Sequence, residues 1–232
     1  MSEYLILDLV ILIGPLLASF EKQIRFIRYF IPAMLSILLV GSVYIAWDIW
    51  ATDRGHWSFN PEYVGDFRFL GLPTEEMLFF WVVPYAGLFI WHVIGFYREG
   101  REDQITFSSM RNGIMIAAMG LILGIGKGYE YTGLAFVSSG LFMMADQGFK
   151  INLTQSVRFW HTQVLIIGAT LLFNGFLTAL PVVLYGESFQ LGLRIFTIPV
   201  EDFVYGFSLC AWVMLVFRVL EKGRRERVIG SS

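Results

Sequence analysis

The sequence predicts an all-α membrane protein with about seven transmembrane helices, arranged as two parallel three-helix repeats joined by a linker helix. Of its 232 residues, 56% are hydrophobic and 16% are charged, which fits a polytopic membrane protein better than a soluble domain. Several apolar runs approach the length of about 20 residues that crosses a bilayer as a helix. A polar pattern also recurs, with Pro73 repeated as Pro199 at a shift of 126 residues.

Seven apolar segments are expected to cross the membrane. The first is short and contains Asp8, and the second is followed by a polar loop at residues 52–61. The fourth carries Gly120, Gly124 and Gly128, a small-residue stripe that lets helices approach closely in lipid. The sequence leaves open whether the fourth and fifth segments cross the membrane fully. In chain order, the expected spans cover residues 4–19, 30–50, 73–96, 112–126, 131–145, 159–184 and 199–220.

Two acidic motifs relate the halves of the chain. The motif Leu72-Pro73-Thr74-Glu75-Glu76 begins the third span, and Ile198-Pro199-Val200-Glu201-Asp202 begins the seventh. The shift of 126 residues superposes these pairs: Glu75 and Glu201, Glu76 and Asp202, Arg68 and Arg194, and Asp48 and Asn174. Polar matches that keep one register are hard to produce by chance in an apolar chain. We therefore expect two three-helix repeats.

An extra span between the repeats sets their relative direction. Three spans alone would invert the second repeat, and a fourth restores its direction, so both acidic motifs are expected at one membrane face. The expected divisions are residues 1–97 for the first repeat, 98–128 for the connector and linker helix, 129–222 for the second repeat, and 223–232 for a basic cytoplasmic tail.

The basic residues predict the orientation of the chain. With the C-terminus inside, only four of the 17 Lys and Arg residues fall in outer loops, and loops rich in positive charge stay cytoplasmic. We expect an integral protein of the cytoplasmic membrane with its N-terminus outside and its C-terminus in the cytoplasm. The four outer residues are Arg54, Arg68, Lys127 and Arg194.

The acidic motifs carry the predicted catalytic chemistry. Proline and acids are also typical of an ordinary helix start, but two copies in register favour a functional use. Carboxyl groups in a site of low dielectric constant can hold a proton and act as acids. Because neighbouring helical residues point about 100° apart, we expect pairing between repeats rather than within one motif. The predicted catalytic residues are Glu75, Glu76, Glu201 and Asp202.

Other polar and aromatic residues gather around these motifs. Asp48 and Asn174 are candidates either for the site or for interhelical hydrogen bonds. Arg68 and Arg194 are either counter-ions of the acids or interfacial anchors. Aromatic rings form interfacial belts, but they also stabilise cations by about 0.5–2 kcal/mol. The aromatic residues predicted to bind substrate are Trp47, Phe79, Phe80, Trp81, Phe173 and Phe203.

The sequence lacks the signatures of several common chemistries. It has no dinucleotide or phosphate-binding glycine motif and no aspartate-rich pair for diphosphate. Its histidines, His56, His92 and His161, do not have metal-ligand spacing, and its basic residues are scattered rather than clustered in a patch for nucleic acid. We expect no metal, no cofactor and no nucleic-acid partner.

These motifs resemble those of the membrane-integral, flavin-independent lycopene cyclases, which occur as two small subunits or as one fused chain. The resemblance spans nearly the whole chain. It implies a fused lycopene beta-cyclase, an isomerase that converts lycopene through gamma-carotene to beta-carotene within the lipid. The motifs that carry the resemblance are Asp48-x-x-x-Thr52, Gly55-x-Trp57 and Leu72-Pro73-Thr74-Glu75-Glu76 in the first half, and Asn174-x-x-x-Thr178 and Ile198-Pro199-Val200-Glu201-Asp202-Phe203 in the second.

The implied reaction is redox-neutral and suits carboxyl groups. A proton added to the terminal double bond gives a carbocation, the neighbouring alkene attacks it, and a different proton leaves the ring. One carboxyl is expected to donate a proton and another to accept one. Four questions stay open: which carboxyl donates, whether the ring is beta or epsilon, whether one or both ends close, and whether the chain forms a homo-oligomer.

A proton-coupled or small-solute transporter is the alternative, because parallel repeats and intramembrane acids also occur in transporters. A transporter is expected to have helix-breaking Gly or Pro at matching mid-membrane positions. The matched prolines of this chain are instead predicted at helix starts, which favours the enzyme. A third hypothesis is a scaffold protein that binds carotenoid, and the function of such a scaffold would tolerate loss of the acids.

Overall fold

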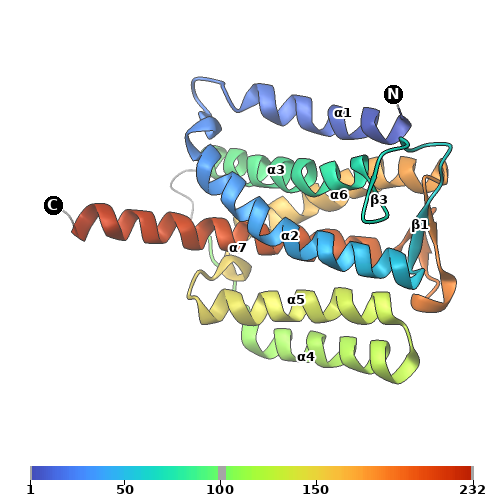
Figure 1. The fold of residues 1–232 in the computed structure, drawn as a ribbon. Helices are drawn as coiled ribbons and strands as arrows, with labels where there is room; N and C mark the ends of the chain where they lie inside the picture. The colour runs from blue at the N-terminus through green and yellow to red at the C-terminus, as the bar shows by residue number, and fades with distance from the viewer. Residues whose placement is uncertain (1, 99–102, 231–232) are drawn as a thin grey trace.

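The computed structural model describes residues 2–98 and 103–230, with side chains described up to residue 224. Figure 1 shows the helices packed side by side along one common direction. Arg101 of the predicted connector, residues 231–232, and the side chains of Arg225 and Arg227 in the predicted tail lie outside the described residues. The α-helices are α1 (Glu3–Ala18), α2 (Phe30–Arg54), α3 (Thr74–Tyr97), α4 (Ser109–Leu121), α5 (Glu130–Gly148), α6 (Val157–Ala179) and α7 (Val200–Gly230).

Five of these helices are long and apolar enough to cross a membrane, as judged over the described residues by length and composition. The predicted all-helical, membrane-type fold is therefore confirmed at the level of its class. The segments are α2 with its preceding turn, α3, α4 with the π-helical turn at Ile122–Gly126, α6, and α7 up to Arg224. The predicted first span forms α1, which has only 16 residues. The predicted fifth span forms α5, whose 19 residues include Glu130 and Asp146.

The end of the predicted sixth span is wrong. The sequence predicts a helix to residue 184, whereas α6 ends at Ala179 and residues Val183–Tyr185 form strand β4. This strand pairs antiparallel with β1 (Trp57–Phe59), inside the segment predicted to be a polar loop. A short apolar run fits a strand as well as the end of a helix, and the long-range pairing decides between them.

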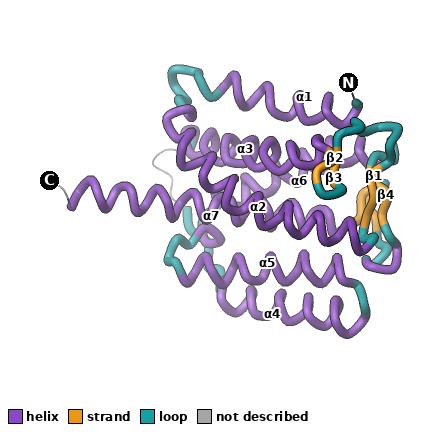
Figure 2. The backbone as a smooth tube through the Cα atoms, viewed as in Figure 1, coloured by secondary structure: helices purple, strands orange, loops and turns teal. Residues whose placement is uncertain are grey.

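Two short hairpins precede α3 and α7, and they have the same register. Their tips, Leu70 and Phe196, both have left-handed backbone, with φ of 50° and 56°. Figure 2 shows the strands gathered at one end of the helices. The hairpins consist of β2 (Arg68–Phe69) with β3 (Leu72–Pro73), and β5 (Arg194–Ile195) with β6 (Ile198–Pro199). The Cα partners are Arg68 and Pro73, Phe69 and Leu72, Arg194 and Pro199, and Ile195 and Ile198.

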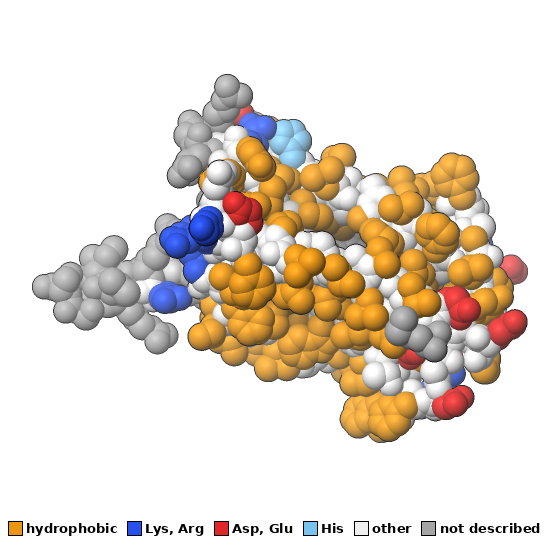
Figure 3. Space-filling model, turned by 90° about the horizontal axis from the view of Figure 1, so that it is seen from above, with side chains coloured by type: hydrophobic (Ala, Val, Ile, Leu, Met, Phe, Trp, Pro, Cys, Tyr) orange, Lys and Arg blue, Asp and Glu red, His pale blue; other side chains and the backbone are white. Residues whose placement is uncertain are grey.

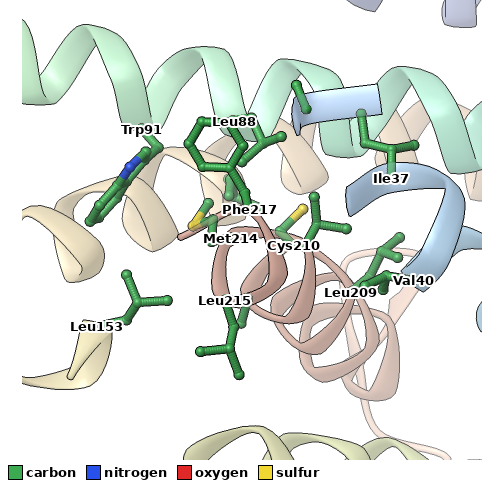
Figure 4. Packing of buried hydrophobic residues seen from close by; sticks show 14 of the residues in the cluster. Ile37, Val40, Leu88, Trp91, Leu153, Leu209, Cys210, Met214, Leu215 and Phe217 are labelled. Atoms are coloured by element: carbon green, nitrogen blue, oxygen red, sulfur yellow. The ribbon is translucent and has the colours of Figure 1, made fainter. Parts of the chain in front are cut away.

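Helix α7 lies at the centre of the hydrophobic core. Figure 4 shows Leu209, Cys210 and Met214 of α7 packed near Ile37 of α2 and Leu88 of α3. The outward faces of α1, α2, α4 and α6 carry exposed apolar side chains, which suits contact with lipid. In Figure 3 the basic residues lie mainly at the end near the C-terminus, the acidic residues lie mainly at the opposite end, and a hydrophobic surface separates them.

Helices α4 and α5 approach each other through glycines. A Cβ added to Gly120 would lie 2.7 Å from the carbonyl oxygen of Gly133, and Gly124 faces the same residue. The predicted close approach is therefore observed at Gly120 and Gly124. Gly128 instead lies in the turn before α5, with φ of 79°.

We predict that Gly133→Val separates α4 from α5 and destabilises the protein. A Cβ at Gly133 would lie 2.5 Å from the Cα of Gly124, and overpacking of this kind costs about 1–3 kcal/mol. Thermal unfolding in detergent micelles measures the change. Gly148→Ala is the matched control in α5, because no atom lies within 4 Å of its added Cβ. An unchanged unfolding temperature for Gly133→Val would contradict the close contact.

Candidate functional site

An elongated cavity of about 130 Å³ lies among the helices, beside the β1–β4 pair. One face of α3 lines it from Glu76 to Ile90, a length of about 21 Å at 1.5 Å per helical residue. Away from the strands, its walls are apolar and are formed by Val83, Ala86, Gly87, Ile90, Ile166 and Ala169. The cavity is therefore a narrow apolar groove with a chemically different end near the strands.

Four carboxyl groups line the polar end of this groove: Asp8, Asp48, Glu76 and Asp202. Asp8, Asp48 and Asp202 are buried, and Glu76 is partly buried. Glu76 and Asp202 are the second acids of the two motifs, so the fold brings one acid from each half into the same cavity. The groove thus joins an apolar channel to a cluster of acids.

Aromatic donors hold two acids of the first half, Asp48 and Glu76. The hydroxyl of Tyr4 donates to Glu76 Oε2 at 2.7 Å, and the indole nitrogen of Trp57 donates to Asp48 Oδ1 at 2.6 Å. The Asp48 carboxyl lies beside that of Glu76. Two adjacent carboxylates repel each other, so this pair is suited to hold one proton between them.

Asp202 accepts three hydrogen bonds. The hydroxyls of Tyr131 and Tyr185 donate at 2.7 and 2.6 Å, and the side-chain amide of Asn174 donates at 2.6 Å. Burial and the charge of Asp202 raise the pKa of Tyr185 well above its ordinary value, so this phenol stays protonated and remains a donor. Three donors of this kind stabilise an ionised carboxylate.

The first acids of the two motifs do not line the cavity. Adjacent helical residues point about 100° apart, and Glu75 and Glu201 turn toward the loops that precede the hairpins. The backbone amides of Gly65 and Leu191, which lie at equivalent positions of the two halves, each donate to them at 2.8 Å. A hydroxyl adds a second bond in each case, from Ser2 to Glu75 and from Thr132 to Glu201.

The two predicted arginines also lie outside the cavity lining. Arg68 lies near the Glu75 carboxyl. Arg194 is exposed, donates to the carbonyl oxygen of Thr197 at 2.7 Å, and lies over the ring of Tyr185 at 5.5 Å. Both residues therefore belong to the hairpins that support the site.

The predicted substrate-binding aromatics divide into two sets. Phe79 and Phe173 line the groove. Trp47 packs against the rings of Tyr44 and Tyr205 instead. The other predicted aromatics outside the lining are Phe80, which is buried in the core, Trp81, which is exposed, and Phe203, which is partly buried.

Several site residues were not predicted from the sequence. Asp8 interrupts an apolar run, and a carboxyl there is costly in a membrane segment, so this signal alone could have identified it. Tyr131 leaves no such signal, because the shift of 126 residues places it on Leu5 rather than on Tyr4. Tyr185 ends strand β4 and lies one residue beyond the predicted sixth span.

His56 anchors the β1–β4 cover over the polar end. It is buried, stacks on Phe189 at 4.4 Å, and lies 3.1 Å through Nε2 from a carboxylate oxygen of Glu130. Arg54 binds the same carboxylate. Burial lowers the pKa of His56 despite this partner. The network ties the end of α2 to the start of α5 beside the cover.

Fold and cavity together define a class of helical membrane protein that holds an apolar groove ending in carboxyl groups. The sequence model of the lycopene cyclase family matches residues 2–94 and again residues 128–220, so the chain belongs to this family. Residue 128 follows residue 2 by 126 positions, as residue 220 follows residue 94, which is the shift that superposes the acidic motifs. Comparison with curated proteins and with solved structures gave no significant match.

We predict that acidification destabilises the fold through His56. Because its pKa is lower in the folded chain, the unfolded chain binds the proton more readily, and stability present at neutral pH is lost as the pH falls below about 6.5. His56→Gln should therefore show a smaller drop in unfolding temperature than the wild type between about pH 7.5 and 5.5. His161→Gln, at an exposed position, should keep the wild-type dependence. Equal drops for all three proteins would contradict the prediction.

Proposed function

We propose that the protein is a lycopene beta-cyclase, which closes the acyclic ends of lycopene into rings by protonation. The observation that carries the proposal is the junction of a long apolar groove with a carboxyl cluster built from both halves of the chain. A linear hydrocarbon fits the groove, because nothing along its walls demands a polar partner. The carboxyls can deliver and remove protons at the end of that hydrocarbon.

In the proposed complex, the polyene lies along α3 and α6 and its terminal double bond lies among the acids. Phe79, Phe173 and Tyr205 line the same end, and aromatic faces stabilise a desolvated cation by about 2 kcal/mol. The β1–β4 pair covers this end with Trp57 and Tyr185. Such a cover excludes the water that would otherwise trap the cation.

The proposed reaction leaves the atom count of the hydrocarbon unchanged. A proton adds to the terminal alkene, the electron pair of the next alkene forms the ring bond, and the electrons of a ring C–H bond form the new double bond. In this scheme Asp202 and the Asp48–Glu76 pair stabilise the cation and accept the departing proton. Glu75 and Glu201 position the surrounding loops through their backbone contacts.

We propose that one site processes both ends in succession, giving gamma-carotene and then beta-carotene. The support is that the second acids of both motifs face a single cavity. A half-closed product would leave, turn round and present its second acyclic end to the same acids.

We further propose that the helices form two parallel three-helix repeats with α4 as the linker, within a cytoplasmic membrane and with the C-terminus inside. The recurrent hairpins and the two family matches support the repeats. Strands β1 and β4 occupy equivalent positions and pair with each other, as expected if the repeats meet about a twofold axis. The basic end seen in Figure 3 supports the orientation.

The positions of helix-breaking residues favour the cyclase over a transporter. Pro84 lies inside α3, but the equivalent position of α7 is Cys210. The chain therefore does not repeat this proline, and α3 is continuous through it, whereas broken helices at corresponding positions are typical of transporters built from repeats.

Expression in a lycopene-accumulating bacterium tests the proposed activity. We expect lycopene to disappear and monocyclic and then bicyclic carotene of the same mass to accumulate, as measured by chromatography and mass spectrometry. In deuterium oxide each ring should retain one deuterium, because each closure begins with a proton from an exchangeable carboxyl. Unchanged lycopene in cells that contain the folded protein would contradict the proposal.

The second acids should matter more for turnover than the first acids. We expect Glu76→Gln and Asp202→Asn each to lower the cyclisation rate by at least about 100-fold, the lower range for loss of an acid or base. Glu75→Gln and Glu201→Gln should lower the rate of folded protein less than about tenfold, while reducing thermal stability. Glu62→Gln, at an exposed loop position, is the control. If Glu76→Gln and Asp202→Asn each abolish only one ring, the single-site scheme fails.

A further inference from the structure

Asp8 differs from every other acid of the cavity. Its side chain is fully buried in α1 and lines the groove, yet neither carboxyl oxygen has a hydrogen-bond partner within the described part of the chain. Tyr4 lies one turn earlier on the same face of α1 and binds Glu76. Four helical residues span about 6 Å along the axis, so Asp8 lies along the groove from the Asp48–Glu76 pair.

The other three acids have donors that stabilise their ionised forms. Asp48 accepts from Trp57, Glu76 accepts from Tyr4, and Asp202 accepts from three groups. A buried carboxylate without donors or a counter-ion is far more costly than a neutral carboxylic acid. The Asp48–Glu76 pair shares its proton between two carboxyl groups, whereas Asp8 has no donor within the described residues to stabilise an ionised form and is suited to hold a proton of its own. No acceptor in this part of the chain competes for that proton.

We propose that Asp8 is the proton donor of the cyclisation, a role that rests on the proposed cyclase function. The carboxylic acid points into the groove, where the terminal double bond of the polyene would lie. The carboxylates on the other walls face the charge that this transfer creates. Donor and stabilising groups are thus separated around one reacting end, which is the arrangement that acid catalysis followed by cation stabilisation needs.

The proposed step balances. The O–H bond of Asp8 breaks and a C–H bond forms at the terminal alkene, which leaves a tertiary cation and an aspartate. The next alkene donates its electron pair to close the ring, and the ring then loses a proton to a carboxylate of Asp202 or of the Asp48–Glu76 pair. Asp8 regains a proton and that carboxylate loses one before the next turnover, so no net charge or electron is transferred.

Asp8→Asn tests the donor role in the full-length protein. We expect the conversion of lycopene to fall by at least about 100-fold, because the amide cannot supply the proton. Asp8→Glu should recover part of the activity, because it restores an acid at a shifted position. The donor role is overturned if the wild type cyclises lycopene and Asp8→Asn retains more than about a tenth of the wild-type rate. That result would leave the cyclase function intact.

Binding of a cation mimic separates a neutral donor from another carboxylate. The probe is a polyene in which a tertiary ammonium nitrogen replaces the terminal carbon that becomes cationic during the proposed reaction. We expect Asp8→Asn to bind it within about threefold of the wild type, and Asp202→Asn to bind it at least about tenfold more weakly, because only the second change removes a buried negative charge. Equal weakening by both variants would show that Asp8 is ionised and would overturn the proposal.

Stability controls exclude a merely structural effect. Asp146→Asn changes another buried aspartate, whose oxygens accept from the backbone amides of Leu153 and Thr154 outside the cavity. Asp146→Asn should lower thermal stability and keep the turnover of the folded fraction. Asp8→Asn should keep thermal stability and lose turnover. If Asp8→Asn does not fold, thermal stability and turnover are measured for Asp8→Leu instead, because leucine matches the apolar walls. A wild type that binds the ammonium probe but leaves lycopene linear would instead refute the cyclase function itself.

Discussion

The need to hold carboxyl groups inside an apolar cavity is the constraint on which the rest of the structure depends. A buried carboxylate is tolerated only where donors surround it, and the fold recruits those donors from distant segments. Tyr4 comes from α1, Tyr131 from α5, and Trp57 and Tyr185 from strands β1 and β4. Helix α1 and strands β1 and β4, which add little to the core around α7, are therefore explained by what they donate.

The two halves share a backbone plan but divide the chemistry unequally. Asp48 of the first half corresponds to Asn174 of the second, and Asp8 corresponds to Leu134. The extra acids thus lie in the first half, while the second half supplies a carboxylate that an amide and two phenols hold in place. A symmetric pair of sites would protonate and deprotonate with identical groups. The observed divergence instead places acids with different hydrogen-bond partners in one cavity.

The sequence was sufficient to predict the helical class and to locate the two acidic motifs at a constant shift, because these depend on local composition and on spacing along the chain. It did not predict which acid of each motif faces the cavity. Neighbouring helical residues point about 100° apart, but this angle does not determine which of the two points inward. Tyr131 was missed for another reason. It reaches Asp202 from a helix whose contacts do not keep the repeat register, so only the packing of α5 against α7 reveals it.

Adjacent acids at a helix start serve two purposes at once. In each half, the first acid binds a backbone amide ten residues upstream, which closes the loop around the hairpin and fixes the rotation of the following helix. That rotation determines where the second acid points. A slip of one residue would turn the loop-binding acid into the groove and leave the loop amide without its acceptor. Because the helix dipole stabilises negative charge at both positions, the same short motif can anchor the loop before each hairpin and place a second acid in the groove. The repeated hairpin is thus the device that aims Glu76 and Asp202 at a common point.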